Sequence, residues 1–78
     1  MIKIKFISVD QDVNYSMITK NSENFSNVEL PLYDKYPKYK YSENFFLVNG
    51  NLLNKGKTLE ENHIKNNDTI TLMINNCD

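Results

Sequence analysis

The side chains best suited to chemistry in this sequence are one histidine and one cysteine, each close to carboxylates. His63 follows Glu60 and Glu61, and Cys77 precedes Asp78. A histidine beside carboxylates can move protons or bind a metal ion, and a thiolate is a nucleophile. The chain has no second histidine or cysteine to complete a ligand set, and the charge of Asp78 opposes thiolate formation. We therefore expect no enzyme activity, no metal site and no cofactor.

A second candidate site is the stretch from Tyr33 to Tyr41, in which tyrosines and lysines alternate. Stacked aromatic rings and lysines together suit single-stranded nucleic acid, which offers bases and phosphates. Three lysines and one aspartate make the stretch only weakly positive, and tyrosines at the end of a sheet commonly pack half-buried. We therefore expect packing as their main role, with nucleic-acid binding as the alternative. The candidate binding residues are Tyr36, Lys38, Tyr39 and Lys40.

Length and charge exclude several classes of protein. Nine lysines and ten acidic residues among 78 residues give a net charge of -1, so no overall field attracts nucleic acid or an anionic membrane. No apolar run approaches the roughly 20 residues that a membrane-spanning helix needs. The single cysteine cannot form an internal disulfide, and no leader-like segment precedes the first strand, so we expect a cytoplasmic or nuclear location. One domain over residues 1–78 fits this length.

The first half of the chain predicts a hairpin and one helix. Apolar and polar residues alternate from Met1 to Ser8 and from Val13 to Met17, as in half-buried strands. Three apolar residues then recur at helical spacing, namely Phe25, Val28 and Leu32.

Local signals set the expected limits of that helix. Either Asn24 or Ser26 could be its N-cap, and the segment from Ser26 to Glu29 has the spacing of a capping box. Pro31 predicts a short or kinked helix because an interior proline loses a backbone hydrogen bond. Pro37 should stop the helix by about Tyr36, and a loop should follow as far as Tyr41.

The second half predicts three more strands. An apolar strand from Phe45 to Val48 reaches a turn at Gly50, and Leu53 should lie on a short fourth strand. A helical turn with Thr58 as its N-cap should follow. The last strand alternates and should bury three apolar residues, namely Ile70, Leu72 and Ile74.

From Phe46 to Ile74 this order of pieces resembles the second half of ubiquitin. The most specific part is Gly56-Lys57-Thr58-Leu59, which is followed by an acidic pair and by Ile64 before the last strand. The resemblance extends weakly over residues 1–34. It implies an α+β, ubiquitin-like β-grasp fold, in which a mixed sheet of four to five strands packs on one main helix.

The end of the chain departs from the family pattern. Conjugated ubiquitin-like modifiers need a tail that ends in Gly-Gly, and no glycine follows Gly56 here. The resemblance therefore implies a non-conjugated protein-interaction module, such as an adaptor. One alternative is a truncated or unprocessed modifier whose diglycine tail is absent from this chain. A weaker alternative is a nucleic-acid-binding β-grasp protein.

The strand pattern turns apolar side chains away from the core. If Phe46 and Val48 face the core, pleating turns Phe45 and Leu47 outward. Apolar side chains on a solvated face favour aggregation unless something covers them, which indicates a binding surface.

The last strand and the resemblance point to the same face. Alternation turns Thr71 and Met73 outward, and ubiquitin carries its receptor-binding patch on the corresponding outer face of its sheet. The expected partner-binding residues are Ile7, Val9, Phe45, Leu47, Thr71 and Met73. Three alternatives remain for this face: the C-terminal residues could cover it, a homodimer could form through it, or its exposure could have no function.

Overall fold

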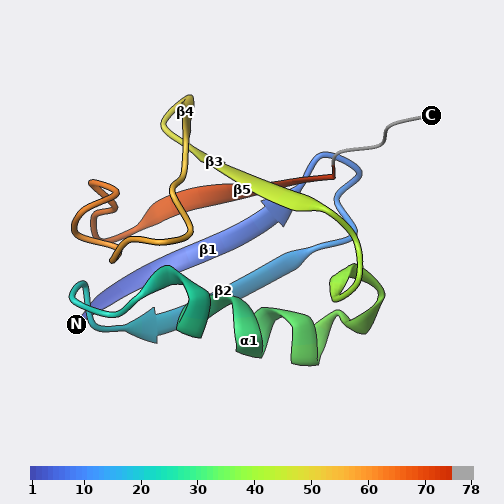
Figure 1. Ribbon diagram of the computed structural model, residues 1–78, viewed down its shortest axis with the longest axis horizontal. Helices are drawn as coiled ribbons and strands as arrows, with labels where there is room; N and C mark the ends of the chain where they lie inside the picture. The colour runs from blue at the N-terminus through green and yellow to red at the C-terminus, as the bar shows by residue number, and fades with distance from the viewer. Residues whose placement is uncertain (75–78) are drawn as a thin grey trace.

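The computed structural model describes residues 1–74 and shows an α+β fold with one mixed sheet and one α-helix (Figure 1). The strands are β1 (Ile2–Ser8), β2 (Asn14–Thr19), β3 (Asn44–Val48), β4 (Asn51–Leu52) and β5 (Asp68–Ile74). Between β2 and β3 lie the helix α1 (Phe25–Lys35) and the 3-10 turn η1 (Pro37–Tyr39). Cys77, which we interpret as incidental, lies outside the described residues.

The five strands are arranged in the order β2-β1-β5-β3-β4. β1 and β5 are parallel and form the centre of the sheet, whereas the other neighbours are antiparallel. The predicted N-terminal hairpin and the mixed sheet on one helix are therefore confirmed. The register of the parallel pair places Ile7 of β1 beside Thr71 of β5.

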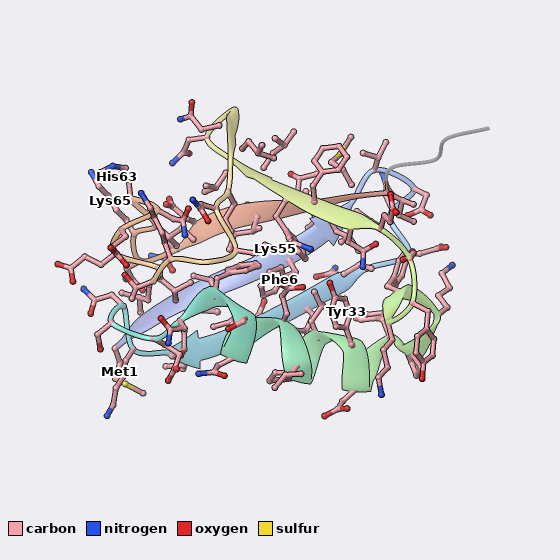
Figure 2. The ribbon with its side chains drawn as sticks, viewed as in Figure 1. Met1, Phe6, Tyr33, Lys55, His63 and Lys65 are labelled. Carbon is pink, nitrogen blue, oxygen red and sulfur yellow. The ribbon has the colours of Figure 1, made fainter. Side chains whose placement is uncertain are left out.

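The core lies between α1 and one face of the sheet, which we call the inner face. Phe6, Phe25 and Phe46 meet there, and the Phe25 and Phe46 ring centroids are 4.9 Å apart. Figure 2 shows Phe6 between the sheet and the helix. The predicted helical stripe is fully buried against this cluster, as are Ile70 and Leu72 of β5. The opposite, outer face is free of helices in the part of the chain that the structure describes.

Two predicted details of the strands are wrong. Ile74 is 40% exposed, because it pairs with Asn44 at the end of the sheet, beyond the last buried pair, Phe46 and Leu72. Leu53 follows β4 and is not part of it. It is nevertheless buried, and its N–H donates to the Phe46 carbonyl oxygen at 2.9 Å.

The helix begins at one of the two predicted N-caps, but without the predicted capping interaction. Asn24 is the N-cap, its side chain makes no capping hydrogen bond, and Ser26 lies inside the helix. The Phe25 N–H instead donates to the Lys57 carbonyl oxygen at 3.0 Å, and Asn24 forms an isolated bridge with Thr58. The predicted capping box at Ser26 is therefore wrong, because a distant loop satisfies the end of the helix.

A reciprocal capping box does occur in the loop before β5. The Thr58 N–H donates to Glu61 Oε1 at 3.0 Å, and the Glu61 N–H donates to Thr58 Oγ1 at 3.1 Å. The predicted capping role of Thr58 is confirmed, although a hydrogen-bonded turn follows it in place of a helix. Hydrogen bonds from Thr58, first from its backbone N–H and then from its side chain, lower the pKa of Glu61 below 4.5.

Pro31 is the seventh of the eleven residues of α1 and therefore lies well beyond the first turn. The helix still ends where the sequence predicts, since Tyr36 is the C-cap and its N–H donates to the Leu32 carbonyl oxygen at 2.9 Å. The expected loop to Tyr41 contains the 3-10 turn η1, with Pro37 in its first position.

Candidate protein-binding face

The strand registers bring the predicted partner-binding residues together on the outer face. Ile7 of β1 lies beside Thr71 of β5, Thr71 lies beside Leu47 of β3, and Leu47 lies beside Leu52 of β4. Paired residues share one face of a sheet. Four strands therefore contribute to one continuous row, which we call the apolar row: Ile7, Thr71, Leu47 and Leu52.

A second pair extends this row toward the end of the sheet. Phe45 lies beside Met73, and both side chains are partly exposed, like Ile7, Leu47 and Thr71. Neighbouring strands cover one side of each of these half-buried side chains, and the other side stays accessible to a partner. Phe45 and Met73 therefore widen the apolar row into a patch.

Val9 lies just beyond the end of β1 and is 71% exposed. It lines one surface hollow with Ile7 and Thr71, and a second hollow with Met73 and Tyr39. The structure therefore brings all six predicted partner-binding residues to one region.

The turn that carries Val9 is held by Ser8 and Asp10. The Ser8 hydroxyl donates to Asp10 Oδ1 and accepts a hydrogen bond from the Val13 N–H at 3.0 Å. The Ser8 hydroxyl, followed by the Asp12 N–H, lowers the pKa of the exposed Asp10 carboxyl. These bonds fix the position of Val9 between two anchored residues.

Sequence reasoning missed Leu52, which is 69% exposed on the outer face. β3 and β4 are joined by Asn49 and Gly50, whose φ angles are +53° and +79°. Two positive φ angles in a two-residue loop are typical of the hairpin turn that Asn-Gly favours. That turn pairs Leu47 with Leu52, so the Asn-Gly signal could have placed Leu52 in the patch.

The remainder of the outer face carries two lysines among mostly polar residues, with the exposed Ile18 as its apolar member. Lys5 lies between Ser16 of β2 and Thr69 of β5, and Lys3 lies beside Ile18. The ion pairs within residues 1–74 are Lys38–Asp12 and Lys55–Glu29, so neither Lys3 nor Lys5 is paired there. We call Lys3, Lys5, Ser16 and Thr69 the basic rows.

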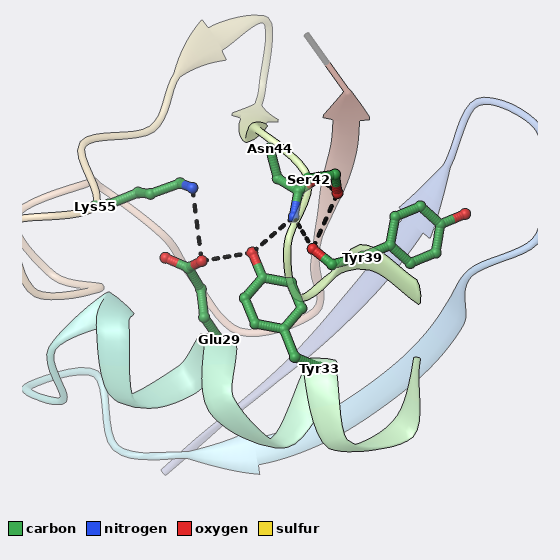
Figure 3. A network of polar contacts seen from close by, with 6 residues as sticks. All are labelled: Glu29, Tyr33, Tyr39, Ser42, Asn44 and Lys55. Atoms are coloured by element: carbon green, nitrogen blue, oxygen red, sulfur yellow. Dashed lines mark hydrogen bonds and ion pairs between the residues drawn. The ribbon is translucent and has the colours of Figure 1, made fainter. Parts of the chain in front are cut away.

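A polar network ties the inner side of β3 to the helix (Figure 3). The Tyr33 hydroxyl donates to Glu29 Oε2 at 2.6 Å and accepts from Asn44 Nδ2 at 3.1 Å. Lys55 Nζ lies 3.6 Å from the same Glu29 oxygen and 5.3 Å from the centroid of the Phe46 ring. Burial, followed by the hydrogen bond to Glu29, raises the pKa of Tyr33. The network links α1, β3 and the loop after β4.

The Tyr33–Tyr41 stretch is used mainly for packing. Tyr39 is 1% exposed, so its ring is not accessible as a stacking platform in this structure. The Tyr36 hydroxyl donates to the Asn14 carbonyl oxygen at 3.1 Å. Lys38 pairs with Asp12 at 2.9 Å, and that hydrogen bond raises the pKa of Lys38. Lys40 lies over the Tyr41 ring, which is 90% exposed.

His63 lies in the loops at one end of the molecule, at the same end as Lys65 and away from Tyr33 (Figure 2). Its side chain is exposed and its φ is +60°. Within residues 1–74 no three His, Cys, Asp or Glu side chains are grouped closely enough to bind a metal ion. No described helix has the length and apolar character needed to cross a membrane.

No model of a known protein family matches this chain, and no curated protein matches it either.

Proposed function

We propose that this chain is a ubiquitin-like β-grasp domain that acts as a non-conjugated protein-interaction module. The observed mixed sheet on one helix is compatible with that fold. The order of sequence pieces from Phe46 to Ile74 supports the ubiquitin-like assignment, and the proposal includes no catalytic role.

The main support for this proposal is the apolar row. Four neighbouring strands place Ile7, Thr71, Leu47 and Leu52 side by side on the face that no described helix covers. The core is complete without them, because the inner face already packs its own apolar residues against α1. Contiguous apolar surface that does not serve the core is typical of a protein-binding site.

The test compares partner capture by three forms of the domain. The wild type, a Leu47→Glu/Met73→Glu variant and a matched Leu30→Glu/Tyr41→Glu variant are immobilised, and extract of the cell that makes the protein is passed over each. Leu30 and Tyr41 are exposed apolar residues that lie outside the strands of the sheet, so the control carries the same added charge away from the outer face. Circular dichroism and denaturation establish first that both variants are folded.

We expect the wild type and the Leu30/Tyr41 control to capture the same proteins and the Leu47/Met73 variant to lose them. Equal capture by all three forms would contradict docking through the outer face. Capture of nucleic acid that requires Tyr36, Lys38 and Lys40 and that moderate salt releases would favour nucleic-acid binding over protein binding.

A further inference from the structure

The outer face has an apolar region and a basic region, and the order of these regions along the strands restricts the chemistry of a partner. Along β1 the outward residues run from Ile7 to Lys5 and then Lys3. Along β5 they run from Met73 and Thr71 to Thr69. A segment that lies along these central strands would therefore cross an apolar region first and a basic region next.

We propose that the partner of the outer face is an acidic, amphipathic peptide segment, whose apolar side chains cover the part of the patch on the central strands, Ile7 and Met73, and whose carboxylates meet Lys5 and Lys3. This inference rests on the proposed function and specifies the chemistry of its partner. Seven of the nine lysines have no carboxylate partner within residues 1–74, and Lys3 and Lys5 are the two of them that lie at strand positions on the outer face. A carboxylate of the partner would supply the charge that the domain does not provide there.

A second copy of this chain does not provide that charge through the same face. The outward strand positions of the described sheet contain two lysines and no carboxylate. Two copies packed through this face would cover the apolar row while leaving the lysines of both copies without an acidic partner. Charge complementarity therefore favours a different chain over a homodimer.

Nucleic acid fits the same face poorly. Its recognition needs accessible aromatic rings and several positive charges along a groove. The basic rows offer two lysines with no aromatic residue beside them, and the one outward aromatic ring of the described strands, Phe45, lies beside Met73 and not beside the lysines of β1. An apolar surface next to a lysine pair suits a peptide with leucine-like and acidic side chains.

The strand spacing predicts where the acidic residues should occur in the partner. Outward residues two positions apart are about 7 Å from each other, so Lys5 and Lys3 lie about 7 and 13 Å beyond Ile7. A helical partner advances about 5.4 Å per turn. Its carboxylates should therefore lie about one turn and about two to three turns beyond its last apolar anchor. An extended partner should place them about two and four residues beyond it.

The test is selection of peptides from a displayed library of random 16-residue sequences. The targets are the wild type, a Lys3→Glu/Lys5→Glu variant and a Lys35→Glu/Lys40→Glu variant. The last variant has the same change in net charge at exposed lysines near the end of α1 and therefore controls for nonspecific attraction. A fourth target, Met73→Glu, tests the apolar part of the patch on the central strand β5.

We expect the wild type and the Lys35/Lys40 control to enrich peptides with leucine-like anchors and, on one side of these anchors, Asp or Glu at one of the two spacings. The Lys3/Lys5 variant should bind these peptides on the order of tenfold more weakly and should enrich Lys or Arg at the same positions.

The outcomes separate this inference from the proposed function. If selected peptides need Met73 but carry no acidic preference, or if the Lys3/Lys5 variant selects the same peptides, the acidic partner is wrong and the docking face stands. Peptides indifferent to Met73→Glu, or no enrichment at all, would count against both. Tight binding of a labelled oligothymidine that Lys3→Glu/Lys5→Glu abolishes, or self-association that Met73→Glu abolishes, would overturn the peptide partner.

Discussion

Phe45 and Phe46 are neighbours on β3 and have the same side chain, but they belong to different surfaces. Phe46 is fully buried and contacts the rings of Phe6 and Phe25, whereas Phe45 lies on the outer face beside Met73 and is partly exposed. The apolar side chains of the inner surface form the core, whereas those of the outer surface stay partly exposed and are not part of the core. The difference shows that the same residue type has a stability role on one face and a candidate binding role on the other.

The largest effect should come from truncating the two phenylalanines one at a time. Phe46→Ala should cost about 3 to 5 kcal/mol of unfolding free energy, because it leaves a cavity in the core. Phe45→Ala should cost about 1 kcal/mol or less, because its side chain keeps water on one side. Urea denaturation of both variants measures the difference. Equal losses would show that the two surfaces are not distinct.

A smaller effect should follow from removing one hydroxyl of the network that ties α1 to β3. Tyr33→Phe leaves the Glu29 carboxylate, whose side chain is only 12% exposed, without the Tyr33 hydrogen bond. The expected loss is about 1 to 2 kcal/mol. Tyr41→Phe is the matched control, because Tyr41 is 90% exposed and its hydroxyl faces water. Denaturation midpoints that move equally in both variants would rule out a stabilising role for the network.

The exposed leucines test the outer face with little effect on stability. Leu52 and Leu30 are 69% and 63% exposed, one on the outer face and one on α1. Leu52→Glu and Leu30→Glu should each change the unfolding free energy by about 0.5 kcal/mol or less. Only Leu52→Glu should weaken binding to the captured partners, as measured by calorimetric titration. Loss of binding in both variants would place the site elsewhere.

The smallest effect concerns pH. The pKa of Glu61 is lowered in the folded chain, so its contribution to stability is present above the unfolded pKa near 4.5 and is lost as the pH falls through the lower folded value. Glu61 is exposed, so the contribution is small. Glu61→Gln should therefore flatten part of the decline in stability below about pH 4.5. Thermal melts between neutral and acidic pH provide the measurement, with Glu60→Gln as the control.

Much of the fold could be predicted from local patterns. Period-two alternation located β1 and β2 and separated the inward from the outward residues of β3 and β5, and helical spacing identified the buried stripe of α1. The same alternation placed Phe45, Leu47, Thr71 and Met73 on one face. These features depend on backbone geometry within a single element, which is why a sequence alone can reveal them.

The errors occurred where two distant segments meet. The helix start depends on the Lys57 carbonyl oxygen, 32 residues beyond Phe25, so the capping-box spacing at Ser26 gave the wrong answer. Packing was the expected main role of the tyrosines after α1, but only the tertiary structure shows that Tyr39 is buried to 1% exposure. Ile74 continues the buried alternation of β5, but the covered part of the sheet ends at the pair Phe46 and Leu72.

The sequence alone determined which residues turn outward on each strand, because pleating has a fixed period of two. Only the tertiary structure decided which of those residues become neighbours. The order β2-β1-β5-β3-β4 and the registers of its pairs join Ile7, Thr71, Leu47 and Leu52 in one row and place Lys5 and Lys3 beyond it. Strand order depends on long-range pairing and on the packing of the whole core, and no local pattern specifies it.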